Sequence, residues 1–336
     1  MKPFAYLRPA SVTEAVRACA GHPGARFLGG GTNLVDLMKL GVETPDLLID
    51  VGRLPLDRVT ATSEGGLRIG ATVRNSDLAA HPAVRTLRPA LSQALLAGAS
   101  GQVRNVATTG GNLLQRTRCP YFQDLSKPCN KRTPGEGCSA RESTHRDLAV
   151  LGYSTQCVAI APSDMAVALA ALDATVHLHG PEGERIVPVT DFQRLPGENP
   201  DQDTVIRPGE LITELVLPPV PDSTVSLYRK ARDRASFAFA LASVAAVLSV
   251  RDGRIGHATL AFGGLAHRAW RARAAEEVLR GAPATHDTFV RAVQAELDAA
   301  RPLRGNAFKV DLARNLAVGA LAELTARAAS PATPRT

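Results

Sequence analysis

The first 56 residues alternate short apolar segments with polar turns, in the order typical of a β–α–β unit. Ser11 and Glu14 have the spacing of a capping box, which predicts a helix that begins there and ends near residue 20. A short strand over 25–28 leads into a run of glycines, and a helix over 34–40 follows it. The apolar segment 45–51 is typical of a buried strand.

A second α+β unit is predicted from residue 57 onward. Residues 66–71 resemble a strand, Asn75-Ser76-Asp77 is expected to cap a short helix, and 89–99 is typical of an apolar helix. Residues 103–112 are expected to form a strand that runs into a second glycine turn. Residues 116–157 then change character, because they are rich in Arg, Lys, Pro, Gly and Ser. A loop this long inside a compact domain is either functional or evidence against the assignment of the segment as a loop.

Regular structure is expected to resume at residue 158. Ser163-Asp164 caps a predicted helix over 165–172, a strand over 175–179 follows, and 193–203 has the composition of a loop. The proline-rich stretch 218–221 resembles a linker.

The remainder of the chain predicts a separate α+β unit. Asp252-Gly253 has the chemistry of a hairpin turn between two apolar strands, and three helices are expected after it, over 269–280, 289–300 and 311–327. The overall prediction is an α+β protein made of an N-terminal subdomain (1–56), a second subdomain (57–221) with an insert (116–157), a C-terminal domain (222–330) and a tail (331–336).

The composition narrows the function classes. Hydrophobic residues make up 45% and charged residues 21%, which is ordinary for a globular protein. No apolar run approaches the roughly 20 residues that a membrane span needs. The net charge of +7 comes mostly from scattered arginines, and aromatic residues make up only 4%, which argues against a nucleic-acid stacking platform. Scattered basic residues instead suit an acidic partner subunit or an anionic cofactor.

Two glycine-rich turns are the first candidate site. Residues 28–34 lie between a predicted strand and a helix, and Thr108-Thr109-Gly110-Gly111-Asn112 repeats the combination of glycine, threonine and asparagine. Such turns let backbone N–H groups approach an anion. The first run has neither the dinucleotide fingerprint, which would need glycine at Leu34, nor the P-loop pattern. A plain tight turn explains one run alone, but two such turns favour a diphosphate held between subdomains.

Four cysteines form the second candidate site. Cys119, Cys129, Cys138 and Cys157 have the spacing C-x9-C-x8-C-x18-C, whereas Cys19 stands alone on a predicted helix. The spacing fits neither the compact ferredoxin run nor the paired knuckles of common zinc sites. From spacing alone, an iron–sulfur cluster, a zinc ion and free thiols all stay open. Cys19 is expected to be a small buried residue.

Several motifs in order resemble one family. The two glycine runs, Ser163-Asp164, the segment Arg207–Ile212, Tyr228-Arg229-Lys230 and Phe262-Gly263-Gly264 resemble signatures of the FAD-binding subunits of the molybdenum hydroxylases. The resemblance implies a two-subdomain FAD-binding domain followed by a smaller α+β domain. It also implies contacts with FAD from Leu28, Gly29, Gly30, Gly31, Thr32, Asn33, Leu34, Thr108, Gly111, Asn112, Asp164 and Lys230. A cation at Lys230 would favour the reduced flavin.

The cysteine-bearing insert narrows the resemblance to the aldehyde oxidoreductase type. In that type the insert carries a [4Fe–4S] cluster, so the resemblance implies that Cys119, Cys129, Cys138 and Cys157 are its ligands. Lys127, Lys131, Arg132 and Arg141 would offset the negative charge of the cluster.

The function implied by the resemblance is electron transfer within a heterotrimer. Electrons released by aldehyde oxidation at a large molybdenum-cofactor subunit would pass through a small [2Fe–2S] subunit to FAD, and then to an external acceptor. Two alternatives are a stand-alone flavin oxidase or reductase and a zinc-braced, non-catalytic assembly subunit. The N-terminus lacks the apolar region of a secretory signal. We therefore expect a cytoplasmic protein, or a periplasmic one exported with a signal-bearing partner subunit.

Overall fold

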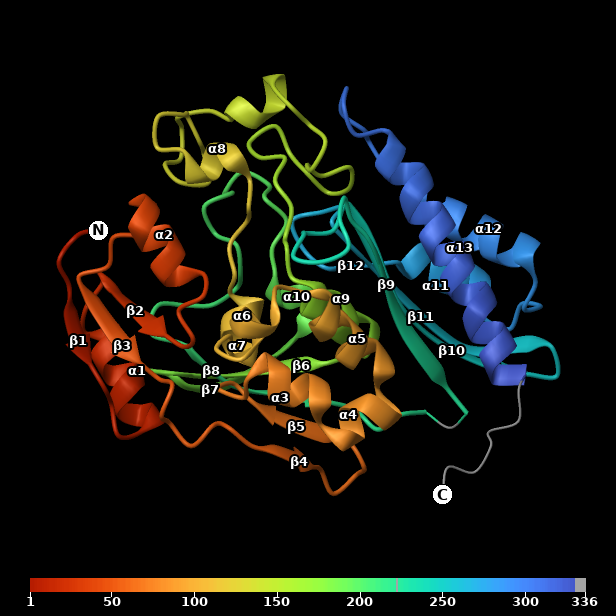
Figure 1. The fold of residues 1–336 in the computed structure, drawn as a ribbon, viewed down its shortest axis with the longest axis horizontal. Coiled ribbons are helices and arrows are strands. Elements are labelled where there is room, and N and C mark those ends of the chain that lie inside the picture. Colours follow the sequence, from red (N-terminus) through yellow and green to blue (C-terminus); the bar gives the residue numbers. More distant parts are fainter. Residues whose placement is uncertain (222, 330–336) are drawn as a thin grey trace.

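Three β-sheets and the helices packed around them make up the computed structural model, which describes residues 1–221 and 223–329 (Figure 1). The predicted tail, residues 331–336, lies outside the described residues. The mixture of sheets and helices confirms the predicted α+β class. None of the described helices is long and apolar enough to cross a membrane.

The N-terminal sheet has three parallel strands in the order β1-β3-β2. The strands are β1 (Ala5–Leu7), β2 (Ala25–Leu28) and β3 (Leu47–Asp50), and the helices α1 (Val12–Ala20) and α2 (Leu34–Leu40) connect them. The predicted β–α–β start is therefore confirmed.

Local capping chemistry explains where α1 begins. The Ser11 hydroxyl accepts a hydrogen bond from the Glu14 N–H at 3.1 Å. The Glu14 carboxylate accepts the return bond from the Ala10 N–H at 2.7 Å, one residue earlier than in a standard capping box. The first bond satisfies an orphan N–H of the first helical turn and the second fixes the preceding residue, so the sequence signature correctly located the start of the helix.

The second sheet has five antiparallel strands in the order β4-β5-β8-β6-β7. Only β5 and β6 were anticipated from the hydrophobic pattern. The strands are β4 (Val59–Ala61), β5 (Leu67–Gly70), β6 (Thr175–Gly180), β7 (Gly183–Pro188) and β8 (Leu211–Leu217).

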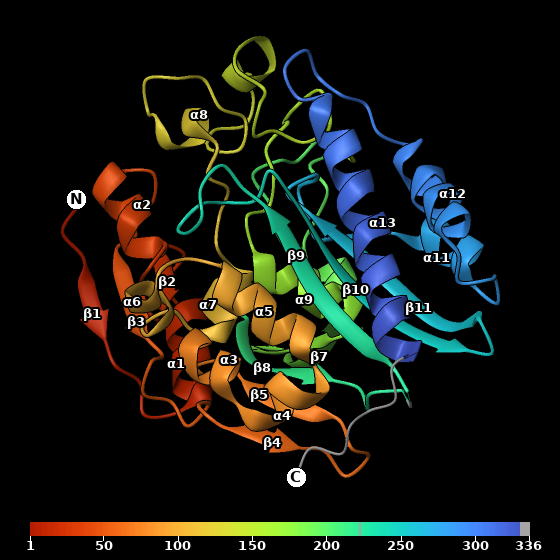
Figure 2. The same cartoon turned by 45° about the vertical axis from the view of Figure 1, so that its right-hand side comes forward.

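A layer of helices lies between this sheet and the C-terminal sheet (Figure 2). Its centre is α9 (Asp164–Ala171), which is buried along its whole length and capped by the Ser163 hydroxyl, as predicted. The other helices of this layer are α3 (Asn75–Ala80), α4 (Pro82–Leu87), α5 (Pro89–Ala97) and α10 (Val189–Phe192).

The strand predicted over residues 103–112 is wrong. The structure has two short helices there, α6 (Gly101–Arg104) and α7 (Thr109–Leu113). The Ser100 hydroxyl accepts from the Val103 N–H, and the Thr108 hydroxyl accepts from the Gly111 N–H, both at 3.3 Å. These two N-caps favour helical turns over an extended strand.

The C-terminal domain is a four-stranded antiparallel sheet in the order β12-β11-β10-β9, followed by three helices. The predicted hairpin joins β10 to β11 through Asp252-Gly253. The elements are β9 (Val225–Ala231), β10 (Ala242–Arg251), β11 (Arg254–Gly263), β12 (Trp270–Arg271), α11 (Arg273–Leu279), α12 (His286–Leu297) and α13 (Phe308–Ala329).

This C-terminal sheet buries side chains on both faces. Leu227 and Ala246 belong to a core shared with α11, α12 and α13. Their neighbours Tyr228 and Val247 belong to the core that contains α5 and α9. Because side chains of a strand alternate between faces, one sheet joins two hydrophobic cores.

The insert has almost no regular structure beyond α8 (Pro120–Gln123) and a 3₁₀ turn over Ser139–Glu142. Its small core contains the four clustered cysteines together with Phe122. The Asn306 side chain and the Lys309 ammonium donate to the Leu148 carbonyl at 3.2 and 2.8 Å, which ties the end of the insert to the C-terminal domain.

Candidate functional site

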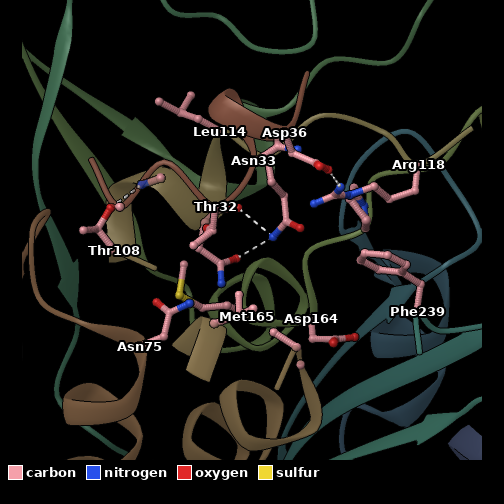
Figure 3. A pocket seen from close by; sticks show the side chains of 18 of the residues that line it. Thr32, Asn33, Asp36, Asn75, Thr108, Leu114, Arg118, Asp164, Met165 and Phe239 are labelled. Carbon is pink, nitrogen blue, oxygen red and sulfur yellow. Dashed lines mark hydrogen bonds and ion pairs between the residues drawn. The ribbon is translucent and has the colours of Figure 1, made fainter. Parts of the chain in front are cut away.

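A cavity of about 990 Å³ opens where the N-terminal subdomain, the second subdomain and the C-terminal domain meet (Figure 3). Both glycine turns line it, as predicted for a ligand held between subdomains. The C-terminal domain contributes Lys230 and the segment 237–241, and the insert contributes residues 117–120. Residues from both subdomains, the insert and the C-terminal domain therefore line the cavity.

The two glycine turns pack directly against each other. A Cβ atom on Gly30 would lie 2.1 Å from the Val106 carbonyl oxygen, and one on Gly29 would lie 2.7 Å from the Thr108 hydroxyl. Gly31 has a φ of +71°, a conformation that favours glycine. The glycines thus allow the close approach of the two turns, as well as exposing backbone to a ligand.

The structure gathers the predicted FAD contacts around this one cavity, with one exception. Leu28 ends β2, where its carbonyl accepts from the Val51 N–H at 3.0 Å, and it is not among the described residues that line the cavity. The predicted contacts that do line it are Gly29, Gly30, Gly31, Thr32, Asn33, Leu34, Thr108, Gly111, Asn112, Asp164 and Lys230.

Four buried polar atoms on cavity-lining residues have no hydrogen-bond partner within the described chain. They are Asn33 Nδ2, Thr72 Oγ1, Asn75 Oδ1 and Arg118 Nε. Buried polar groups are normally paired, so these atoms indicate a ligand that both donates and accepts hydrogen bonds. A dinucleotide such as FAD has both kinds of group, so the cavity fits that cofactor.

Thr72 and Asn75 were missed as site residues by the sequence analysis. Asn75 was interpreted as a helix cap, but the N-cap of α3 is Arg74, and Asn75 is only 4% exposed. The available signal was its position at the end of the short apolar segment that joins β5 to α3, where a buried amide needs a partner.

Asp164 and Lys230, which line the cavity, form a buried cluster with Tyr228. The Lys230 ammonium lies 2.7 Å from the Asp164 carboxylate, and the Tyr228 hydroxyl donates to the other carboxylate oxygen at 2.5 Å. Burial raises the pKa of Asp164, against the opposing effect of the Lys230 charge. The positive charge predicted at Lys230 is therefore present, but it is paired with Asp164.

The structure brings the four predicted cysteines together and leaves Cys19 elsewhere, on α1. Cys129 and Cys138 face each other across an isolated β-bridge. A hydrogen bond from Cys157 lowers the pKa of the Cys138 thiol, and burial raises the pKa of Cys119 to about 11. Among the described residues, no three His, Cys, Asp or Glu side chains are placed to hold a single metal ion.

One of the four basic residues predicted beside the cysteines, Lys131, is buried. The side chain of Lys131 is 3% exposed, donates to the Pro200 carbonyl at 2.7 Å and is ion-paired with Asp203. The Arg132 guanidinium instead donates to backbone carbonyls, including that of Phe122 at 2.8 Å. Lys131 therefore combines burial with a place beside the cysteines. The hydrogen bond with Cys138 and burial raise the pKa of the Cys157 thiol, and the Lys131 charge opposes this rise.

His267 lies next to this ion pair without a hydrogen bond on either ring nitrogen. Burial and the Lys131 charge together lower its pKa to about 3, whereas the Asp203 charge opposes the change. An unfolded histidine titrates near pH 6.5. Because the folded-state pKa lies below the unfolded value, the free energy of unfolding decreases as the pH falls from about 6.5 toward 3.

We predict that His267→Leu makes the chain less sensitive to acid. Between pH 7 and pH 5 the wild-type chain should lose about 2 kcal/mol of stability that the variant retains. Urea unfolding at the two pH values measures the difference, with exposed His286→Gln as the control that should behave like wild type. Equal losses in wild type and His267→Leu would contradict the assignment.

Comparison with known families covers nearly the whole chain. Residues 2–220 match the family described as the FAD binding domain in molybdopterin dehydrogenase. Residues 226–324 match the CO dehydrogenase flavoprotein C-terminal domain.

Individual proteins give the same picture. The chain is 52% identical to the aldehyde oxidoreductase FAD-binding subunit PaoB of Escherichia coli K12, over 98% of this chain and 100% of that protein. It is 30% identical to the glyceraldehyde dehydrogenase medium chain of Sulfolobus acidocaldarius, over 83% and 81%. Its fold matches a chain of CO dehydrogenase from Oligotropha carboxidovorans with a TM-score of 0.77 at 25% identity, covering 97% of this chain and 98% of that one.

Proposed function

The chain belongs to the FAD-binding subunits of the molybdenum hydroxylase family, and from this we propose that it passes electrons from partner-subunit [2Fe–2S] clusters through FAD to an external acceptor. It is the flavoprotein subunit of a multi-subunit oxidoreductase. The proposed partners are a small [2Fe–2S] subunit and a large molybdenum-cofactor subunit.

The observation that supports this function best is the cavity built from the two glycine turns. The backbone around Gly30 and Gly111 would hold the diphosphate, and the unpartnered atoms of Asn33, Thr72 and Asn75 would pair with polar groups of the dinucleotide. When bound, FAD supplies a carrier that accepts electrons singly and releases them in pairs.

The buried cluster of Asp164, Lys230 and Tyr228 sets the position of charged groups beside the cofactor. Asp164 holds the Lys230 ammonium in place, and Tyr228 holds Asp164. Because all three side chains are buried, this arrangement stays fixed and needs no rearrangement when the cofactor changes its charge.

We propose an aldehyde as the substrate class of the assembled complex. Two relatives, the PaoB subunit and the glyceraldehyde dehydrogenase medium chain, are named for aldehyde oxidation. The insert and the loop 194–198 resemble the aldehyde oxidoreductase type as well. The complex would lie in the cytoplasm, or in the periplasm if a partner subunit carries an export signal.

We also propose that Cys119, Cys129, Cys138 and Cys157 ligate one [4Fe–4S] cluster. The four side chains share one small core, and they come from the segment that resembles the cluster-bearing insert. Four thiolates suit either a [4Fe–4S] cluster or a zinc ion, and the resemblance of the insert is what favours the cluster.

Anaerobic reduction separates this function from its alternatives. The purified chain with FAD should keep its flavin oxidised when aldehyde is added, whereas the flavin of the assembled complex should be bleached. Bleaching in the isolated chain would favour the stand-alone flavin enzyme. A complex assembled without FAD should still reduce its [2Fe–2S] clusters but lose turnover with external acceptors.

A further inference from the structure

The start of the insert forms part of the cavity wall. Thr117, Arg118, Cys119 and Pro120 all line the cavity. Just before them, the Arg116 N–H donates to Asn33 Oδ1 at 2.9 Å, which orients the amide of a glycine-turn residue. The insert and the candidate FAD site are therefore physically continuous.

Arg118 is held at this wall from two sides (Figure 3). Its Nη1 lies 3.2 Å from the Asp36 carboxylate on α2, and its guanidinium lies 5.2 Å from the centre of the Phe239 ring in the C-terminal domain. An ion pair and a cation–π contact fix the plane of the guanidinium. Arg118 thus joins three parts of the fold at the cavity.

One donor of this held side chain has no partner. Arg118 Nε is buried and makes no hydrogen bond within the described chain. A buried N–H on a charged group that lacks a partner is costly. Since Arg118 lines the cavity, a bound molecule is the natural source of the missing acceptor.

We propose that Arg118 is a further FAD-binding residue, which donates its Nε–H to an oxygen of the bound dinucleotide. FAD offers phosphate oxygens and flavin carbonyl oxygens, and both are acceptors that a guanidinium recognises. The proposal rests on the assignment of the cavity to FAD. Because Arg118 belongs to the insert and directly precedes Cys119, the insert would then contribute directly to FAD binding.

FAD titration of the full-length chain, after removal of its flavin, tests this role. Arg118→Gln should weaken FAD binding about tenfold to a hundredfold, because a hydrogen bond from a charged group is lost. Arg118→Lys keeps the positive charge beside Asp36 but lacks the Nε donor, so it should also bind FAD more weakly. The matched control is Arg141→Gln in the same insert, whose side chain donates to the Thr155 carbonyl and does not line the cavity.

Two fragments identify the acceptor on the dinucleotide. If Arg118 contacts a phosphate, the variants should lose affinity for ADP; if it contacts the flavin, they should lose affinity for riboflavin. Either loss supports the proposal. FAD affinity within twofold of wild type in Arg118→Lys, with a normal unfolding midpoint, would overturn it. Failure of the wild-type chain to bind FAD would instead refute the cavity assignment itself.

Discussion

Gly30→Ala is expected to remove nearly all FAD from the protein. The added Cβ would lie 2.1 Å from the Val106 carbonyl oxygen, which belongs to the backbone and cannot turn aside. The two glycine turns would have to separate, and several contacts to the diphosphate would be lost together. With each such contact contributing about 1.5–3 kcal/mol, affinity should fall by more than about a hundredfold.

Flavin content per chain and FAD titration measure this loss. Gly101→Ala is the matched control, because the nearest atom to its new Cβ is 4.0 Å away and belongs to the flexible side chain of Arg104. That variant should bind FAD normally. The unfolding midpoint of Gly30→Ala should also fall, since forcing an atom into a packed contact costs about 1–3 kcal/mol. Undiminished FAD affinity in Gly30→Ala would show that the turns do not form the site.

The second large effect is expected at the insert. Cys129→Ser should abolish most of the bound iron, because serine replaces one of the four proposed thiolate ligands and the insert has few other apolar side chains to hold it together. Protease sensitivity of the insert should rise in the same variant. Anaerobic purification followed by iron and sulfide assays measures the cluster.

Cys19→Ser is the control for that experiment. Cys19 lies on α1, where it packs against the core of the N-terminal subdomain. Iron content should therefore stay at the wild-type level. One zinc and no sulfide per wild-type chain would contradict the cluster, and iron loss confined to the Cys19 variant would contradict the choice of ligands.

Local chemistry explains which elements could be predicted from the sequence. The cap at Ser11 and the turn at Asp252-Gly253 depend on residues a few positions apart, so their patterns were sufficient. Residues 103–112 were misread as a strand because Ser100 and Thr108 were not recognised as N-caps. Strand β7 is exposed at most of its positions, so its apolar pattern is weak. Strand β8 is mostly apolar and has no exposed position, and it was missed even though its residues carry a strand-like pattern.

The residues of the candidate site that belong to a short sequence motif were predicted. Those whose role depends on contacts between distant segments of the chain were missed. The glycine turns are local in sequence, so their common cavity was anticipated. The role of Gly30 against Val106 was not, because the two turns meet only in the folded chain. Arg118 was missed for the same reason, since its neighbours Asp36 and Phe239 come from distant segments.

Because both faces of the C-terminal sheet are buried, the parts of the chain before and after residues 218–221 depend on each other for folding. Tyr228 and Val247 cover helices α5 and α9 of the preceding subdomain, while Leu227 and Ala246 pack against the helices that follow. A chain cut within the proline-rich stretch 218–221 would expose apolar surface on both fragments. Neither fragment should therefore fold independently, and a C-terminal fragment from a related protein should replace this one only if its residues at the positions of Tyr228 and Val247 pack against α5 and α9.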